Sequence, residues 1–253
     1  MRTVLEMTAV FVHGNPETAA VWSPLLAELG RADVLTLSPP GFGAPVPDGF
    51  GATADEYVAW LATELDAIGE PVDLVGHDWG AMHVLRLACQ RPDLLRSWCT
   101  DTAGSFAHDY VWHEATHAWQ TPGAGEKAVA NLLAMGAAGR ATFYESLGMT
   151  PPVAQACAEG FDVAMGRSIL ALYRSAGQPV LAQWSERLPA ASARPGLVLI
   201  PTEDIYTGGE ARHRWVAERT GAQVTVFEGL GHWWLVENPK LGADALRRFW
   251  STL

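Results

Sequence analysis

The chain has 253 residues, of which 49% are hydrophobic and 18% are charged, a balance typical of a globular protein with a substantial core. Lys and Arg number 17 against 28 Asp and Glu, and no basic cluster interrupts the formal net charge of −11. Because nucleic-acid binding needs a positive face, we expect no nucleic-acid partner. No apolar run reaches the roughly 18 residues that span a bilayer, so we expect no membrane partner.

The cysteines and the N-terminal residues indicate a cellular location. Cys89, Cys99 and Cys157 are an odd number, and their spacing forms no metal-binding pair. The first 12 residues lack a long apolar region followed by a small-residue cleavage site, which predicts no signal peptide. We therefore expect a cytoplasmic protein with reduced thiols, acting as a monomer or a homodimer.

Short apolar runs alternate with amphipathic segments along most of the chain. This pattern predicts strands at residues 8–12, 33–37, 72–75, 97–100, 196–200 and 223–227. Helices are expected at residues 22–29, 53–68, 81–90, 209–220 and 241–253. Continuous apolar strands separated by helices indicate an α/β fold with a mostly parallel sheet flanked by helices on both faces.

The strand pattern vanishes between residues 102 and 188. This stretch is rich in Ala, Trp and His, with helix-like segments at residues 126–135 and 161–174. We interpret it as a helical cap inserted into a core made of residues 1–101 and 189–253. Trp112, Trp119 and Trp184 lie in or near the cap and could wall an apolar pocket.

The strongest motif is GHDWG at residues 76–80, directly after a predicted strand and before a predicted helix. Glycines on either side of the central residue permit a sharp turn, as in the nucleophile elbow, where that residue is exposed at the carboxyl edge of a sheet. The residue at this position is usually serine, but here it is Asp78. A carboxylate nucleophile suits attack on a saturated carbon and would give an alkyl-enzyme ester.

Two later loops supply candidate partners for Asp78. His232 follows the predicted strand at 223–227 and could act as the base that activates water. Asp204 follows the strand at 196–200 and could orient the imidazole of His232. Its neighbour Glu203, or Asp101 at the end of an earlier strand, could be the acid instead.

A fourth candidate is HGNP at residues 13–16, after the first predicted strand. A backbone N–H near His13, together with that of Trp79, could form an oxyanion hole for a tetrahedral intermediate. These groups already provide fixed donors, so we expect neither a metal nor another cofactor.

Together these motifs resemble the α/β-hydrolase fold family, and within it the branch with an Asp nucleophile, the epoxide hydrolases and haloalkane dehalogenases. The resemblance implies one α/β-hydrolase unit with an inserted cap and a small apolar substrate. The first motif lies early, at His13. This implies that the family's N-terminal antiparallel pair is shortened to residues 2–7 or is absent.

The resemblance leaves open which leaving group the site stabilises, a halide ion or the oxygen of an opened epoxide. In the dehalogenases two N–H donors hold the halide, and Trp79 and Asn15 occupy the matching positions. In the epoxide hydrolases two cap tyrosines serve the epoxide oxygen, and Tyr173 matches the second of them. The position of the first holds Ala115. Three nearby residues could substitute for it: His113, His117 and Tyr110.

The leading prediction is hydrolysis of an epoxide to a vicinal diol. The alternative is a haloalkane or haloacid dehalogenase that uses the same Asp78, His232 and Asp204. A minor alternative is a ligand-binding protein on the hydrolase fold without catalysis, against which the complete set of nucleophile, base and acid argues.

Overall fold

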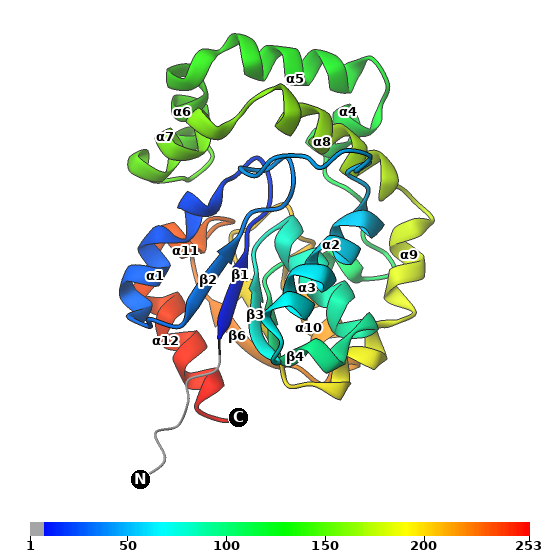
Figure 1. Ribbon diagram of the computed structural model, residues 1–253, viewed down its shortest axis with the longest axis vertical. Coiled ribbons are helices and arrows are strands. Elements are labelled where there is room, and N and C mark those ends of the chain that lie inside the picture. The colour runs from blue at the N-terminus through cyan, green and yellow to red at the C-terminus, as the bar shows by residue number, and fades with distance from the viewer. Residues whose placement is uncertain (1–7) are drawn as a thin grey trace.

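The structure, a computed structural model, describes residues 8–253 and contains one six-stranded parallel sheet (Figure 1). The strands pair in the order β2-β1-β3-β4-β5-β6. Their bounds are Ala9–Val12 (β1), Val34–Leu37 (β2), Val72–Gly76 (β3), Leu95–Thr100 (β4), Gly196–Pro201 (β5) and Gln223–Phe227 (β6). Each corresponds to a predicted strand, and the predicted fold class is confirmed.

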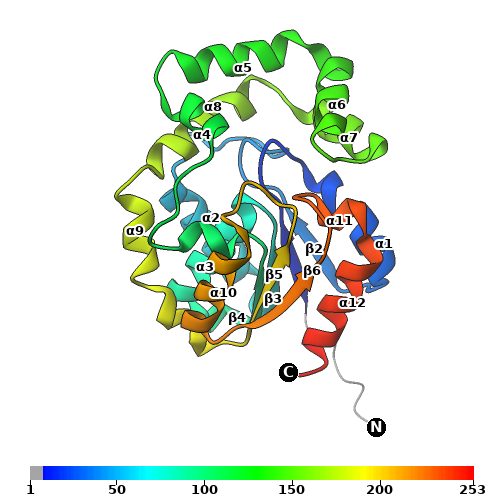
Figure 2. The same cartoon turned by 180° about the vertical axis from the view of Figure 1, so that it is seen from behind.

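Helices cover both faces of the sheet (Figures 1 and 2). On one face lie α1 (Ser23–Leu29), α11 (Trp234–Glu237) and α12 (Pro239–Trp250). On the other lie α2 (Ala54–Ile68), α3 (Trp79–Gln90) and α10 (Gly209–Thr220). Short 3₁₀ helices precede α1 (Ala19–Trp22), follow α3 (Pro92–Leu94), follow β4 (Ala103–Phe106) and precede β5 (Leu188–Ala193). The core consists of the two apolar layers between helices and sheet.

Helix α2 shows how local sequence produces these elements. Thr53 and Glu56 form a capping box, in which the Thr53 hydroxyl accepts from the Glu56 amide and the Glu56 carboxylate accepts from the Thr53 amide. Gly69 ends the helix in the left-handed conformation, with φ of 81°. The apolar face of α2 is buried from Ala54 to Leu65, but Ile68 in the last turn is half-buried.

Between β4 and β5 the described chain forms helices and loops without a strand. The helices are α4 (Glu114–Gln120), α5 (Ala124–Ala134), α6 (Gly136–Ser146), α7 (Pro151–Gly160), α8 (Val163–Ser175) and α9 (Val180–Ser185). Helices α4 to α8 stand over one end of the sheet, whereas α9 runs beside the core (Figures 1 and 2). Assignment of residues 102–188 to a separate cap remains a prediction.

The strand order creates a crevice at the carboxyl end of the sheet. The chain leaves β1 toward β2 and leaves β3 toward β4, so the loops after β1 and β3 diverge, as at the ligand sites of open α/β sheets. Val12 pairs with Gly76, and the His77 amide donates to the Val12 carbonyl at 3.0 Å. The HGNP and GHDWG loops therefore begin side by side.

Three further expectations concern the termini, membranes and thiols. The shortened antiparallel pair expected at residues 2–7 falls outside the described residues. From residue 8 onward, no helix is both long and apolar enough to cross a bilayer. The three cysteines are free.

Candidate active site

Asp78 sits in a strained turn between β3 and α3. Its φ of 51° and ψ of −125° are unusual for a residue with a side chain. The turn also needs small neighbours. A Cβ on Gly80 would lie 2.1 Å from the Val12 carbonyl oxygen, and a Cβ on Gly76 would lie 2.4 Å from the Ala81 Cα. The two glycines thus allow the close packing that presents the Asp78 carboxylate to a cavity.

His232 and Asp204 meet because β5 and β6 are paired neighbours. The Glu203 amide donates to the Leu230 carbonyl at 2.9 Å, which ties the two following loops together. His232 Nδ1 lies 2.7 Å from Asp204 Oδ2, and His232 Nε2 lies 3.6 Å from Asp78 Oδ2. The imidazole therefore stands between the two carboxylates, with Nε2 facing Asp78.

The site perturbs the ionisation of all three groups. Burial raises the pKa of Asp78 to about 6, although the positive charge of His232 opposes this rise. Burial alone would lower the pKa of His232, but the charge and hydrogen bond of Asp204 raise it above 6.5. Burial opposes the ionisation of Asp204 too, yet its interaction with His232 holds its pKa at about 2.

Asn15 contacts one oxygen of Asp78, and Tyr173 lines the same cavity. The backbone N–H of Asn15 donates to Asp78 Oδ1 at 2.9 Å. The side-chain nitrogen of Asn15, Nδ2, lies 3.5 Å from the same oxygen. The Tyr173 hydroxyl interacts with the side chains of Trp79 and Asn15. Burial, followed by the charge of Asp78, raises the pKa of Tyr173 well above its usual value, so the phenol keeps its proton.

Asn15, Asp78, Tyr173 and His232 line a cavity of about 160 Å³. Its apolar walls are Trp119, Leu132, Phe143, Leu147 and Trp233, and no Lys or Arg stands among its described lining residues. Of the three tryptophans predicted to wall a pocket, only Trp119 lines this one. Trp112 instead stacks on Trp79, and Trp184 lies under the guanidinium of Arg86.

The three candidates for the missing cap tyrosine lie in different surroundings. His113 lines the cavity, with Nε2 2.9 Å from the Thr116 hydroxyl, and burial lowers its pKa to about 4. His117 is exposed and is not among the lining residues. Tyr110 donates its hydroxyl to the Tyr206 carbonyl at 2.8 Å and lies outside the lining.

Two other predicted residues have their side chains bound away from the reacting atoms. His13 is fully buried, with Nδ1 2.9 Å from the Gly14 carbonyl and Nε2 3.2 Å from the Ser38 hydroxyl. The contact between this loop and Asp78 comes from the backbone N–H of Asn15, which donates to Asp78 Oδ1. Asp101, the alternative acid, contacts His77 Nδ1 at 2.6 Å, whereas Asp204 contacts His232.

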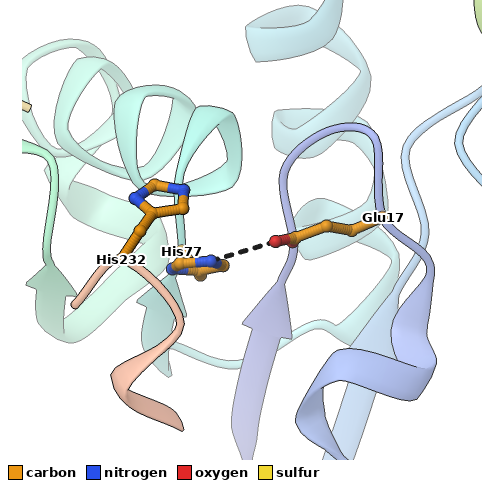
Figure 3. Close-up of side chains that lie close together, drawn as sticks. All are labelled: Glu17, His77 and His232. Carbon is orange, nitrogen blue, oxygen red and sulfur yellow. Dashed lines mark hydrogen bonds and ion pairs between the residues drawn. The ribbon is translucent and has the colours of Figure 1, made fainter. Parts of the chain in front are cut away.

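Two residues that the sequence analysis did not single out complete the surroundings: Glu17 and His77 (Figure 3). Glu17, His77 and His232 each place one polar atom within 4.8 Å of the others. The cluster is a poor metal site, because Asp101 and Glu17 occupy both nitrogens of His77. In the sequence, only the position of Glu17 directly after HGNP and of His77 inside GHDWG could have indicated that these residues belong to the site.

Comparison with known proteins places this geometry in a family. A model described as the alpha/beta hydrolase family matches residues 9–245. The chain therefore belongs to the α/β hydrolase family, and it is a hydrolase of that family.

Two curated relatives match part of the chain. An epoxide hydrolase from Caballeronia sordidicola is 31% identical over 101 residues, which cover 35% of this chain and 28% of that protein. Epoxide hydrolase 2 from Siraitia grosvenorii is 37% identical over 101 residues, covering 35% of this chain and 29% of that protein. The match thus spans less than a third of either relative.

A solved structure matches nearly the whole chain. The DbeA-M1 loop variant of haloalkane dehalogenase from Bradyrhizobium elkanii has a TM-score of 0.69 at 20% identity. The match covers 99% of this chain and 92% of that one. At this identity the likeness shows the fold.

Proposed function

We propose that this hydrolase opens a small, neutral, apolar epoxide to a vicinal diol through a covalent ester on Asp78. The observation that carries the proposal is the position of the Tyr173 hydroxyl. Tyr173 lines the same cavity as Asp78, and its ring lies against that of Trp79 at a centroid distance of 5.1 Å. Because the phenol keeps its proton, it can donate that proton or a hydrogen bond to a substrate oxygen in the cavity.

In the first step an Asp78 carboxylate oxygen attacks an epoxide carbon. The C–O bond of the ring breaks, its electron pair stays on the ring oxygen, and Tyr173 donates a hydrogen bond or its proton to that oxygen. This support matters because a departing alkoxide is a strong base. Once Asp78 is an ester, its negative charge is gone and no longer raises the pKa of His232.

In the second step His232 Nε2 takes a proton from water, and the water oxygen attacks the carbonyl carbon of the ester. Asp204 stabilises the imidazolium that forms, since it lies 2.7 Å from Nδ1. In this proposal two backbone N–H groups stabilise the oxyanion: that of Asn15, 2.9 Å from Asp78 Oδ1, and that of Trp79, the first residue of α3. The intermediate then collapses: the bond between the carbonyl carbon and the alkyl oxygen breaks, the His232 imidazolium returns its proton to the departing oxygen, and the diol leaves while the water oxygen stays in the Asp78 carboxylate.

The second candidate function is haloalkane dehalogenation by the same residues. It is favoured by the Asn15 side chain, which lines the cavity and whose Nδ2 lies 3.5 Å from Asp78 Oδ1. The haloacid version has less support, because the described lining offers no cation for a substrate carboxylate. A parallel panel of epoxides, alkyl halides and haloacids, assayed for diol and halide release, tests all of these functions. A protein that only binds ligands would release neither product.

Tyr173→Phe should separate the two candidates. If the phenol supports the epoxide oxygen, its loss should lower the rate of diol formation by about 100- to 1,000-fold, the usual cost of one such donor. Asn15→Ala should be milder. Tyr144→Phe is the matched control, because the Tyr144 hydroxyl is buried without a partner and Tyr144 is not among the lining residues. The epoxide assignment would be overturned by three results together. Wild type would release free halide, it would turn over no epoxide, and Tyr173→Phe would keep the wild-type rate.

The first step should also show an acid limit. With a pKa of about 6, Asp78 is ionised only above that pH, so ester formation should slow about tenfold for each pH unit below 6. Rapid-quench measurement of ester formation between pH 4 and 9 would reveal this limit. A rate that stays constant down to pH 4 would contradict the raised pKa.

A further inference from the structure

A fully buried charged cluster lies directly behind the nucleophile. Glu17 and His77 have no exposed surface, and Asp101 is 2% exposed. Glu17 Oε1 lies 3.1 Å from His77 Nε2 and accepts from the Trp233 indole at 2.7 Å. Its other oxygen accepts from the Gly14 amide at 3.1 Å. Glu17 thus joins the HGNP loop, the elbow and the loop that carries His232.

Asp101 makes an equivalent set of contacts from the other side of His77. Its Oδ2 lies 2.6 Å from His77 Nδ1 and accepts from the Trp234 indole at 2.8 Å. Its Oδ1 accepts from the amide of Asp78 itself at 3.2 Å. Asp101 therefore connects the nucleophile with the residue two places after His232.

The hydrogen-bond pattern favours one arrangement of charge in this cluster. Glu17 accepts from the Gly14 amide and the Trp233 indole, and Asp101 accepts from the Asp78 amide and the Trp234 indole, so every oxygen of the two groups accepts an N–H, as suits a carboxylate. His77 can donate to both of them only when it carries two protons. The cluster therefore holds two negative charges and one positive charge.

The ionisation tendencies of the groups agree with this assignment. Burial alone would lower the pKa of His77, but the charges of Glu17 and Asp101 raise it well above 6.5. Burial opposes the ionisation of Glu17, yet His77 holds its pKa at about 2. The other titratable groups that interact with His77 are its neighbour Asp78, His13, Cys157 and His232, the last with its ring centroid 4.8 Å away.

We propose that Glu17, His77 and Asp101 form a positioning cluster, in which a permanently charged imidazole and two carboxylates lock three loops in their reactive arrangement. This inference rests on the proposed roles of Asp78 and His232 as reacting groups. The three loops follow β1, β3 and β6. The cluster ties the Gly14, Asp78 and Trp233 positions directly to one another, and so sets the gap of 3.6 Å between nucleophile and base.

The first test measures the charge of His77 in the unmodified protein. In ¹⁵N-labelled enzyme, both ring nitrogens of His77 should keep the chemical shifts of a doubly protonated imidazole from pH 5 to 9. This experiment needs neither a substrate nor a variant. A neutral His77 at pH 7 would overturn the proposal, even if the enzyme opens epoxides.

The second test replaces Glu17 with glutamine, which keeps the shape but removes the charge. Glu17→Gln should bring the titration of His77 into the range of pH 5 to 9. It should also lower kcat/KM on the best epoxide of the panel by about 10- to 100-fold, the effect of losing a charge-assisted hydrogen bond. The remaining rate should change with pH as His77 titrates, which a merely structural contact would not produce.

Glu237→Gln is the matched control. Glu237 also accepts a backbone N–H from the His232 loop, that of Gly231 at 3.1 Å, but it is exposed and does not touch His77. This control should change kcat/KM by less than about twofold. If Glu17→Gln is as active as Glu237→Gln with an unchanged pH profile, the positioning role is wrong. If no epoxide is turned over at all, the proposed function fails, while the titration of His77 still decides the charge of the cluster.

Discussion

Asp78→Asn is expected to lower kcat/KM for an epoxide by about 10⁴-fold or more, because an amide lacks the anionic oxygen that attacks carbon. The substitution is conservative in shape, and asparagine tolerates the φ of 51° at this position. Steady-state rates on the substrate panel provide the measurement. Asp48→Asn, at an exposed loop aspartate, serves as the matched control. Residual activity close to wild type would remove Asp78 from the mechanism.

The same variant should be more stable than wild type at neutral pH. The pKa of Asp78 rises from 3.8 to about 6 on folding, so the folded state binds the proton more tightly than the unfolded state. The ionised carboxylate therefore destabilises the fold above pH 6, and removing it should add up to about 3 kcal/mol to the free energy of unfolding. This gain should vanish below pH 4, where both states are protonated. Urea unfolding of both proteins at pH 4 and pH 8 would measure this difference in the free energy of unfolding. If Asp78→Asn lowers that free energy by the same amount at both pH values, the ionised carboxylate does not destabilise the fold.

His232→Gln is expected to form the ester and then to stop. Attack by Asp78 needs no base, whereas hydrolysis needs His232 Nε2 to take a proton from water. The intact-protein mass should therefore increase by the mass of one epoxide per chain, and peptide mapping should place the adduct on Asp78. Steady-state turnover should fall to near zero, while the first turnover stays fast.

Isotope labelling of wild type checks the same pathway. In a single turnover in H₂¹⁸O, the new hydroxyl of the diol should come from the Asp78 carboxylate, and the label should remain in the protein. If the label enters the diol in the first turnover and His232→Gln never gains mass, water attacks the epoxide directly and no ester forms.

The parts of the fold that follow from local patterns were predictable. Each of the six strands is short, apolar and bounded by turn residues, and each formed where the pattern placed it. The elbow was recognisable because GHDWG lies between a strand and a helix. The loops of Asp204 and His232 follow β5 and β6, so their meeting could be expected once the sheet was parallel.

The parts that depend on tertiary packing were not predictable. Glu17 reads as an ordinary charged residue after a turn, and only the fold reveals that it is fully buried beside His77. Asp101 could have served either histidine from its strand end, and the structure places it on His77. The cavity walls from α5 and α6 depend on how helices pack over the sheet, which residue spacing within one helix does not encode.

The order of the strands has a consequence for synthesis of the protein. Strand β4 lies inside the finished sheet, but its partner β5 follows only after 95 residues of helix and loop, since β4 ends at Thr100 and β5 begins at Gly196. At about 5–20 residues per second, a ribosome needs roughly 5 to 20 seconds to make that segment. Throughout this time the incomplete sheet of four strands exposes the backbone groups of β4 along an apolar edge, which is a template for aggregation. A nascent or truncated chain that stops before β5 is therefore the species in which chaperone dependence should be greatest.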